Sequence, residues 1–135
     1  MTQTEAVVAV IQDYFNLAYE PKSRDFSTIF HPDCRVQWVQ DDRLQILTSS
    51  EYAALINGRP SPRSTGAPRD EGILSVENVS DDLSTATVRV RIGNKLFNDH
   101  FVLHQAEGIV LYTSSSPGCR GWKEAFTFNE IAQRL

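Results

Sequence analysis

The chain has little of what nucleic-acid-binding and membrane proteins depend on. Its 13 Lys and Arg residues are outnumbered by 17 Asp and Glu residues, which gives a formal net charge of -4. Affinity for nucleic acid usually rests on basic side chains clustered along one face, so nucleic acid is not an expected partner. No segment approaches the roughly 20 apolar residues of a membrane span, so no membrane partner is expected either.

Cysteine is also scarce, and the features of secretion are missing. Cys34 and Cys119 form neither a CxxC pair nor a zinc-binding pattern. The start of the chain, Met1 to Glu5, has no basic segment followed by an apolar run. We therefore expect a cytoplasmic protein with two free thiols.

The local motifs of common cofactor and hydrolase chemistry are absent as well. There is no GxGxxG, no Walker loop and no GxSxG. His100 and His104 would lie about 13 Å apart on a strand that rises about 3.3 Å per residue, too far to share an ion. His31, beside Pro32 at a predicted helix end, is interpreted as a capping or surface histidine. We expect neither a metal site nor a cofactor.

What is present is typical of a soluble globular domain. With 135 residues and 41% hydrophobic side chains, the chain can bury a real core, and residues 1–135 are predicted to form a single domain. Thr2 and Glu5 have capping-box spacing and precede apolar residues at helical intervals, Val7, Val10, Ile11, Tyr14 and Ala18. This pattern predicts a long amphipathic helix that ends near Glu20, because Pro21 cannot continue it.

Two further short helices are predicted. The first covers Asp25–Phe30 and is closed by Pro32. The second begins at the capping-box pair Thr48 and Glu51 and ends at Asn57-Gly58. Between them, Val36 and Trp38 alternate with polar residues, and a turn at Asp41-Asp42 leads to a second strand, so a hairpin is expected.

The second half of the chain indicates a sheet. Alternating strands are predicted at Ile73–Val79, Ser84–Ile92, Leu96–His104, Gly108–Ser115 and Trp122–Phe128. Helices followed by consecutive antiparallel strands indicate the α+β class. A curved antiparallel sheet wrapped around the long first helix would leave a pocket between them.

The loop Arg59–Glu71 precedes these strands and contains three arginines and three prolines but almost no apolar residue. Loops of this length without secondary structure are often lids or binding loops and are otherwise merely mobile. Its arginines could meet an anionic group on a ligand, or they could simply be solvated.

A lone carboxylate stands in the most apolar strand. Phe97, Asp99, Phe101 and Leu103 share one face. A desolvated Asp99 would favour the neutral acid, which can donate a hydrogen bond to a ligand oxygen. Alternatively, a shifted register leaves Asp99 at a strand end or paired with an arginine. Glu124 is a second such carboxylate, or an exposed residue at a strand end.

Several segments resemble the nuclear transport factor 2-like (NTF2-like) superfamily, and within it the SnoaL-like and "Putative lumazine-binding" proteins. They are Asp13-Tyr14-Phe15, the "FHPD"-containing segment Phe26–Val36, Ser49–Tyr52 and Asn98–Phe101. The resemblance covers about Glu5 to Tyr112. It implies a cone-shaped barrel with an apolar pocket, commonly in a homodimer. The Ser114–Gly121 segment departs from the family pattern, because it interrupts the passage to the Trp-Lys pair that family members often have in the last strand.

The same superfamily includes the ketosteroid isomerases, in which a tyrosine and a neutral aspartic acid form an oxyanion hole beside an aspartate base. The resemblance implies these two catalytic roles for Tyr14 and Asp99. Trp38 stands at the position of the base and cannot accept a proton. The implied binding residues are Trp38, Phe30, Phe97, Phe101, Val88 and Phe126. Tyr14 could instead simply pack in the core, and none of the other candidate acceptors, His31, Asp33 and Glu124, is singled out by a pattern.

Three functions remain open from the sequence. The first is a cofactor-independent isomerase, dehydratase or cyclase that acts on a small, apolar, oxygenated metabolite, with Tyr14 and Asp99 polarising its carbonyl. The second is a non-catalytic protein that binds or carries a small molecule, which the absent base favours. The third, a protein-interaction module, rests on fold analogy alone.

Overall fold

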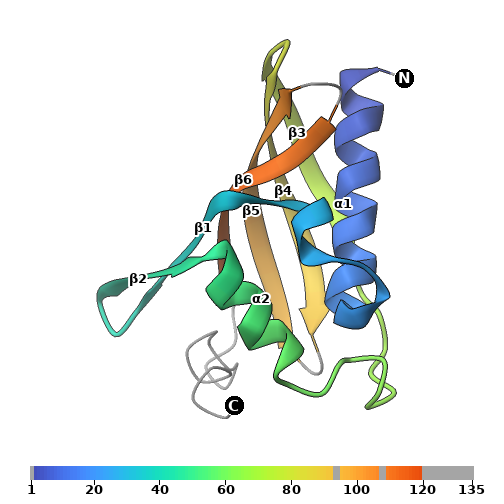
Figure 1. Ribbon diagram of the computed structural model, residues 1–135, viewed down its shortest axis with the longest axis vertical. Helices are drawn as coiled ribbons and strands as arrows, with labels where there is room; N and C mark the ends of the chain where they lie inside the picture. Colours follow the sequence, from blue (N-terminus) through green and yellow to red (C-terminus); the bar gives the residue numbers. More distant parts are fainter. Residues whose placement is uncertain (1, 93–94, 107–108, 120–135) are drawn as a thin grey trace.

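The computed structural model of the chain describes residues 2–92 and 95–106, and the path of the strand at 109–119. Two α-helices lie on one side of a curved sheet, and a long hairpin projects away from it (Figure 1). The described strands form a six-stranded sheet in the order β2-β1-β6-β5-β4-β3. The α+β class expected from the sequence is therefore confirmed. No helix among these residues is long and apolar enough to cross a membrane.

The first helix, α1, spans Gln3–Tyr19. Its N-terminus is capped by Thr2, whose Oγ1 accepts a hydrogen bond from the backbone N–H of Glu5 at 3.1 Å. Its C-cap is Glu20, directly before Pro21. The face of α1 that packs on the sheet is buried and consists of Val7, Ile11, Tyr14, Phe15, Leu17 and Ala18.

The segment after α1 differs from the expected helix at Asp25–Phe30. Only single turns of 3-10 helix form, η1 at Pro21–Ser23 and η2 at Phe26–Thr28. Strand β1 then spans Phe30–Gln40, so Pro32 lies within a strand and does not close a helix. The proline is tolerated there because the pairing of β1 with β6 is irregular between Phe30 and Arg35, where a ladder amide can be missing.

The predicted hairpin and the helix that follows it are confirmed. Strand β1 pairs antiparallel with β2, Arg43–Thr48. Asp41 and Asp42 at the turn both have positive φ, 51° and 62°, the geometry that two-residue hairpins favour. Helix α2, Ser49–Asn57, begins with a reciprocal capping box between Thr48 and Glu51 and has Gly58 at its C-cap.

Four more strands complete the sheet: β3 at Gly72–Ser80, β4 at Leu83–Ile92, β5 at Lys95–Ala106 and β6 at Ile109–Cys119. They pair antiparallel in sequence order. β6 also pairs parallel with β1, so the expectation of a wholly antiparallel sheet was wrong at this pair. The intervening elements from β2 to β5 supply the long connection that a parallel pair requires.

Two predictions for the end of the chain have different outcomes. β6 continues to Cys119, so most of the Ser114–Gly121 segment extends a strand that was predicted to end at Ser115. The strand predicted at Trp122–Phe128 lies outside the described residues.

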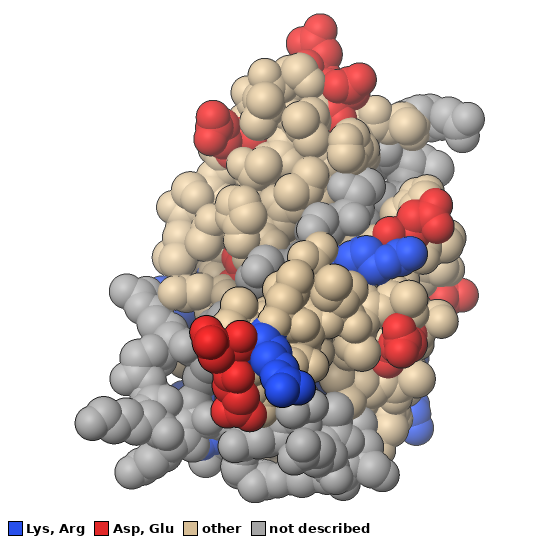
Figure 2. All heavy atoms as spheres, turned by 90° about the vertical axis from the view of Figure 1, so that its left-hand side faces the viewer, with Lys and Arg blue, Asp and Glu red and all other residues tan. Residues whose placement is uncertain are grey.

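Asp and Glu side chains occur at several separate places on the face shown in Figure 2, where Lys and Arg are few and form no continuous basic patch.

Candidate functional site

Tyr14 and Asp99 meet inside the protein, although they lie 85 residues apart in sequence. Tyr14 comes from the middle of α1 and Asp99 from the middle of β5, and the two inward faces oppose each other. Tyr14 Oη donates a hydrogen bond of 2.5 Å to Asp99 Oδ2. Both residues are almost completely buried, with exposed fractions of 2% and 1%.

The surroundings of this pair are apolar. Val88 on β4 is the cross-strand partner of Asp99. The Phe101 ring meets the Tyr14 ring edge to face with centroids 5.0 Å apart, and the Phe30 ring does so at 6.0 Å. The predicted binding residues Phe30, Phe97, Phe101 and Val88 are each at most 1% exposed. They pack as core, and they separate the Asp99 carboxyl from water.

Burial raises the pKa of Asp99 to about 6, and the hydrogen bond from Tyr14 acts in the opposite direction. The upward direction is the one predicted from the sequence. From the sequence we expected Asp99 to be neutral at pH 7 and to donate to Tyr14 or to a ligand oxygen. The neutral state and the donation to Tyr14 were wrong, and donation to a ligand oxygen stays a prediction. Tyr14 is the donor, and because its hydrogen bond stabilises the charged carboxylate, a pKa of about 6 leaves most Asp99 ionised at pH 7.

The second oxygen of this carboxyl group has a different environment. Asp99 Oδ1 is buried and has no hydrogen-bond partner among the residues described. A buried polar atom without a partner is costly and calls for an explanation. When the carboxyl is protonated, Oδ1 can donate to a ligand oxygen, and when it is ionised, Oδ1 can accept a proton.

Tyr52 extends the pair into a chain of three polar side chains. Tyr52 lies in α2 and is 2% exposed. The pKa of Tyr52 is raised overall, mainly by burial and also by the negative charge of Asp99. Arg59 and a hydrogen bond with Tyr14 act in the opposite direction but are weaker. Because Tyr14 gives its one proton to Asp99, it can only accept from Tyr52. Tyr52 was not singled out as a site residue from the sequence, since helical spacing carries no information about this contact.

Arg59 is one of the three loop arginines that, from the sequence, could meet an anionic group on a ligand or could simply be solvated. It follows Gly58, and burial lowers the pKa of its guanidinium. Arg59 lines a cavity of about 260 Å³ between the end of α1, the end of α2 and the following loop. The other lining residues are Glu20, Pro21, Lys22, Ile56, Asn57, Pro60, Ser61 and Ser64.

The remaining predicted binding residues lie apart from this cavity. Trp38 is 8% exposed, and its Nε1 donates to Gln40 Oε1 at 3.4 Å. Phe30 lines a second hollow of about 390 Å³ between η2 and the start of α2. The linings of these two cavities include neither Trp38 nor the Tyr14–Asp99 pair. Phe126 lies outside the described residues.

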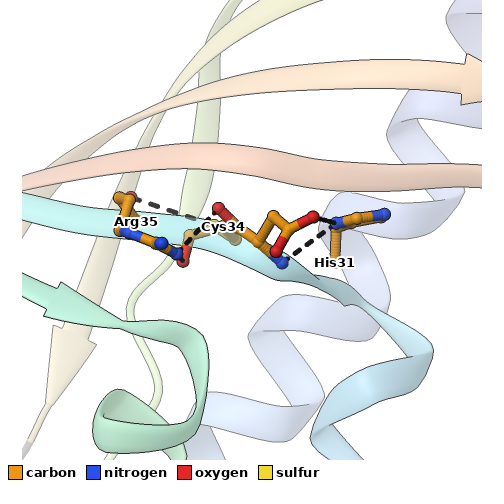
Figure 3. Close-up of polar contacts among 4 residues, drawn as sticks. His31, Cys34 and Arg35 are labelled. Atoms are coloured by element: carbon orange, nitrogen blue, oxygen red, sulfur yellow. Dashed lines mark hydrogen bonds and ion pairs between the residues drawn. The ribbon is translucent and has the colours of Figure 1, made fainter.

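The other candidate proton acceptors do not reach the pair. His31 and Asp33 interact with each other along β1 (Figure 3), and their side chains are 44% and 88% exposed. The backbone N–H of Asp33 donates to His31 Nδ1 at 3.0 Å, so this nitrogen carries no proton in that contact. The Asp33 carboxylate, 3.9 Å away, is therefore not a true ion-pair partner. Glu124 lies outside the described residues.

Neither a reactive thiol nor a cluster of metal ligands occurs in the described part of the chain. Cys34 is fully buried, and burial raises the pKa of its thiol to about 12, which removes the reactive thiolate. No group of three or more potential metal ligands occurs among these residues. His100 and His104 are exposed, and His100 Nδ1 contacts Thr87 Oγ1 at 2.9 Å.

Comparisons with known proteins agree on the fold. A family model described as "Putative lumazine-binding" matches residues 2–109. An NTF2-like protein of unknown function from Shewanella baltica OS155 has a TM-score of 0.78 at 19% identity and covers 89% of this chain and 95% of its own. One from Silicibacter pomeroyi DSS-3 has a TM-score of 0.76 at 18% identity, with 89% and 100% covered. No curated protein matches significantly.

Proposed function

The chain belongs to the family described as "Putative lumazine-binding", within the NTF2-like superfamily, and from this premise we propose that it binds a small, largely apolar, oxygenated molecule at the Tyr14–Asp99 pair. The observation that carries the proposal is the Asp99 carboxyl, which is buried among aromatic rings and has one oxygen, Oδ1, without a partner in the described structure. A ligand oxygen at Oδ1 would satisfy it.

The proposed reaction is an isomerisation, dehydration or cyclisation without a redox cofactor. A carboxyl group with a pKa of about 6 both accepts and releases protons readily near neutral pH. Asp99 Oδ1 would take a proton from the ligand and return it to another atom of the same molecule, so no electrons are gained or lost. The hydrogen bond from Tyr14 to Oδ2 would stabilise the ionised carboxylate that exists before the first transfer and after the second.

Binding without catalysis is the second candidate, and Trp38 favours it. The resemblance to the ketosteroid isomerases puts Trp38 where those enzymes have their base, and an indole cannot accept a proton. Asp99 would then have to serve as both donor and base. A carrier needs only the hydrogen bond at Oδ1 and the apolar rings around it.

A pair of matched probes tests the binding. Acetophenone presents a carbonyl oxygen, and ethylbenzene has nearly the same shape without it. At pH 5, where most Asp99 is protonated, Oδ1 can donate a hydrogen bond. At this pH we expect acetophenone to shift the NMR signals of Tyr14 and Asp99 and to bind at least tenfold more tightly than ethylbenzene, since only the ketone has an oxygen that accepts this bond. Asp99→Ala should abolish the preference, and the exposed control Asp81→Asn should keep it. Equal binding of the two probes refutes the proposal.

Isotope exchange separates the enzyme from the carrier. In D2O, proton abstraction by Asp99 would place deuterium on the acetophenone methyl carbon, which is adjacent to the carbonyl. The wild type should accelerate this exchange at least a hundredfold over Asp99→Asn, within the usual range for a general base. Tight binding without exchange would establish the carrier and refute the enzyme.

The assembly is proposed to be a homodimer of cone-shaped domains. Val39, Leu44 and Ile46 form an apolar row on one face of the β1–β2 hairpin, and they are 70%, 59% and 53% exposed. Such an exposed row is typical of an interaction surface. Sedimentation velocity should give a dimer for the wild type and a monomer for Ile46→Lys, and a monomeric wild type would refute this part of the proposal.

A further inference from the structure

Arg59 carries a positive charge into the protein without compensation. Its Nη1 atom is buried and has no hydrogen-bond partner among the described residues. The ion pairs of the described part of the chain involve other residues, and burial lowers the pKa of the guanidinium. Buried charged groups in proteins are normally paired, because removing them from water is unfavourable. A guanidinium whose Nη1 is buried without a partner therefore points to a missing anion.

The cavity beside Arg59 has room for such an anion and the right charge. Its volume is about 260 Å³. Lys22 and Arg59 contribute two positive charges to the lining and Glu20 one negative charge, so the walls have an excess of a single positive charge. A ligand with one negative charge would neutralise this excess, whereas a dianion would leave a negative charge in a partly dehydrated site.

Arg59 also connects the cavity to the Tyr14–Asp99 pair. The guanidinium is close enough to Tyr52 and Tyr14 for their charges to shift its pKa. Tyr52 is in turn hydrogen-bonded to Tyr14, which donates to Asp99. The charge of Arg59 is therefore coupled electrostatically to Tyr14 of the Tyr14–Asp99 pair, although that pair does not line the cavity.

We propose that this cavity binds the carboxylate of a small organic monocarboxylic acid, with Arg59 as its ion-pair partner. The planar guanidinium donates two parallel hydrogen bonds to a carboxylate, a geometry that a lysine cannot reproduce. The inference goes beyond the proposed function, because the lining of this cavity does not include the Tyr14–Asp99 pair.

Benzoate and its neutral isostere benzamide test the anion site directly. Calorimetry should detect benzoate binding to the wild type at least tenfold tighter than benzamide binding, with an affinity that falls as salt is added. Arg59→Gln should reduce benzoate affinity at least tenfold, and Arg59→Lys should restore only part of it. Arg63→Gln, which removes an exposed arginine from the same loop, should leave affinity unchanged.

An experiment on the wild type alone guards against a variant that fails to fold. In protein labelled with ¹⁵N-arginine, benzoate should shift the side-chain signal of Arg59 and leave that of Arg63 in place. Equal affinities for benzoate and benzamide, or equal losses in the Arg59 and Arg63 variants, would overturn the proposal. Tighter binding of inorganic phosphate than of benzoate would overturn the assignment to carboxylates.

The same titration separates this inference from the proposed function. Asp99→Asn should leave the preference for benzoate over benzamide intact, because Asp99 lies beyond Tyr52 and Tyr14 and is not part of the cavity lining. If acetophenone fails to bind at Asp99 while benzoate binds at Arg59, only the proposed function is lost. If the reverse holds, only the anion site is lost.

Discussion

Replacing Asp99 by Asn should change how the stability of the protein depends on pH. The Asp99 carboxyl has an ordinary pKa of 3.8, which burial raises to about 6 in the folded protein. The folded state therefore holds the proton more tightly than the unfolded state does, and ionisation opposes folding. Asn keeps the shape of the side chain and an oxygen that can accept from Tyr14, but it cannot ionise.

The sign and size follow from linkage. Below about pH 4 the carboxyl is protonated in both states, and its contribution to stability is fully present. That contribution is lost as pH rises from about 4 through about 6. A shift of about two pKa units corresponds to about 3 kcal/mol at about 1.36 kcal/mol per unit. Because the unfolded carboxyl is already partly ionised at pH 4, the part of this effect that falls between pH 4 and pH 7 is smaller, and Asp99→Asn should gain about 2 kcal/mol relative to the wild type over this range.

Urea unfolding at pH 4, 5, 6 and 7 measures this difference. Comparing the wild type with Asp99→Asn at each pH cancels the contributions of the other titrating groups. Asp81→Asn is the matched control, because Asp81 is exposed and its variant should follow the wild type at every pH. A difference between Asp99→Asn and the wild type that is constant with pH, or that changes in the opposite direction, would refute the reasoning.

Two further predictions concern buried residues of β1. Trp38→Ala should lower the free energy of unfolding by about 3 to 5 kcal/mol in urea titrations, because the ring is nearly fully buried. The control Val79→Ala, which shortens an exposed side chain of β3, should lower it by no more than about 0.5 kcal/mol, and equal losses would contradict the packing described. In a Cys119→Ser background, Cys34 should react with iodoacetamide only after unfolding, since its thiol is fully buried with a pKa of about 12; rapid labelling of the native protein would show that the site opens.

The burial of Tyr14 and of Asp99 could be anticipated from the sequence because each lies on the apolar side of a periodic segment, whereas their pairing was implied only by the resemblance to the ketosteroid isomerases. The helical stripe puts Tyr14 on the buried side of α1, and the strand alternation puts Asp99 on the buried side of β5. Which of the two donates could not be predicted. That depends on the balance between desolvation of the carboxylate and the hydrogen bond that stabilises it, a balance set by distances.

The structural environments of Pro32 and Arg59 could not be predicted from the sequence, for physical reasons. Pro32 follows a short apolar stretch and is a usual helix terminator, but an irregular register with β6 lets it sit in a strand. Arg59 is one of three arginines in a segment rich in proline and charge, whose composition left both solvent exposure and contact with an anionic ligand group open. The ends of α1 and α2 converge around it and form the cavity that it lines, and this convergence depends on the tertiary packing of segments that are distant in sequence.

The most direct test of the account is an NMR titration of the Asp99 side-chain carboxyl carbon in the wild type and in Tyr14→Phe. In the wild type, we expect the carboxyl carbon to titrate with a midpoint near the pKa of about 6. In Tyr14→Phe we expect a higher midpoint, because the hydrogen bond from Tyr14 lowers the pKa of Asp99. A midpoint near the ordinary value of about 4 that does not move in the variant would mean that Asp99 is solvated and that the pair is not a buried proton-binding site.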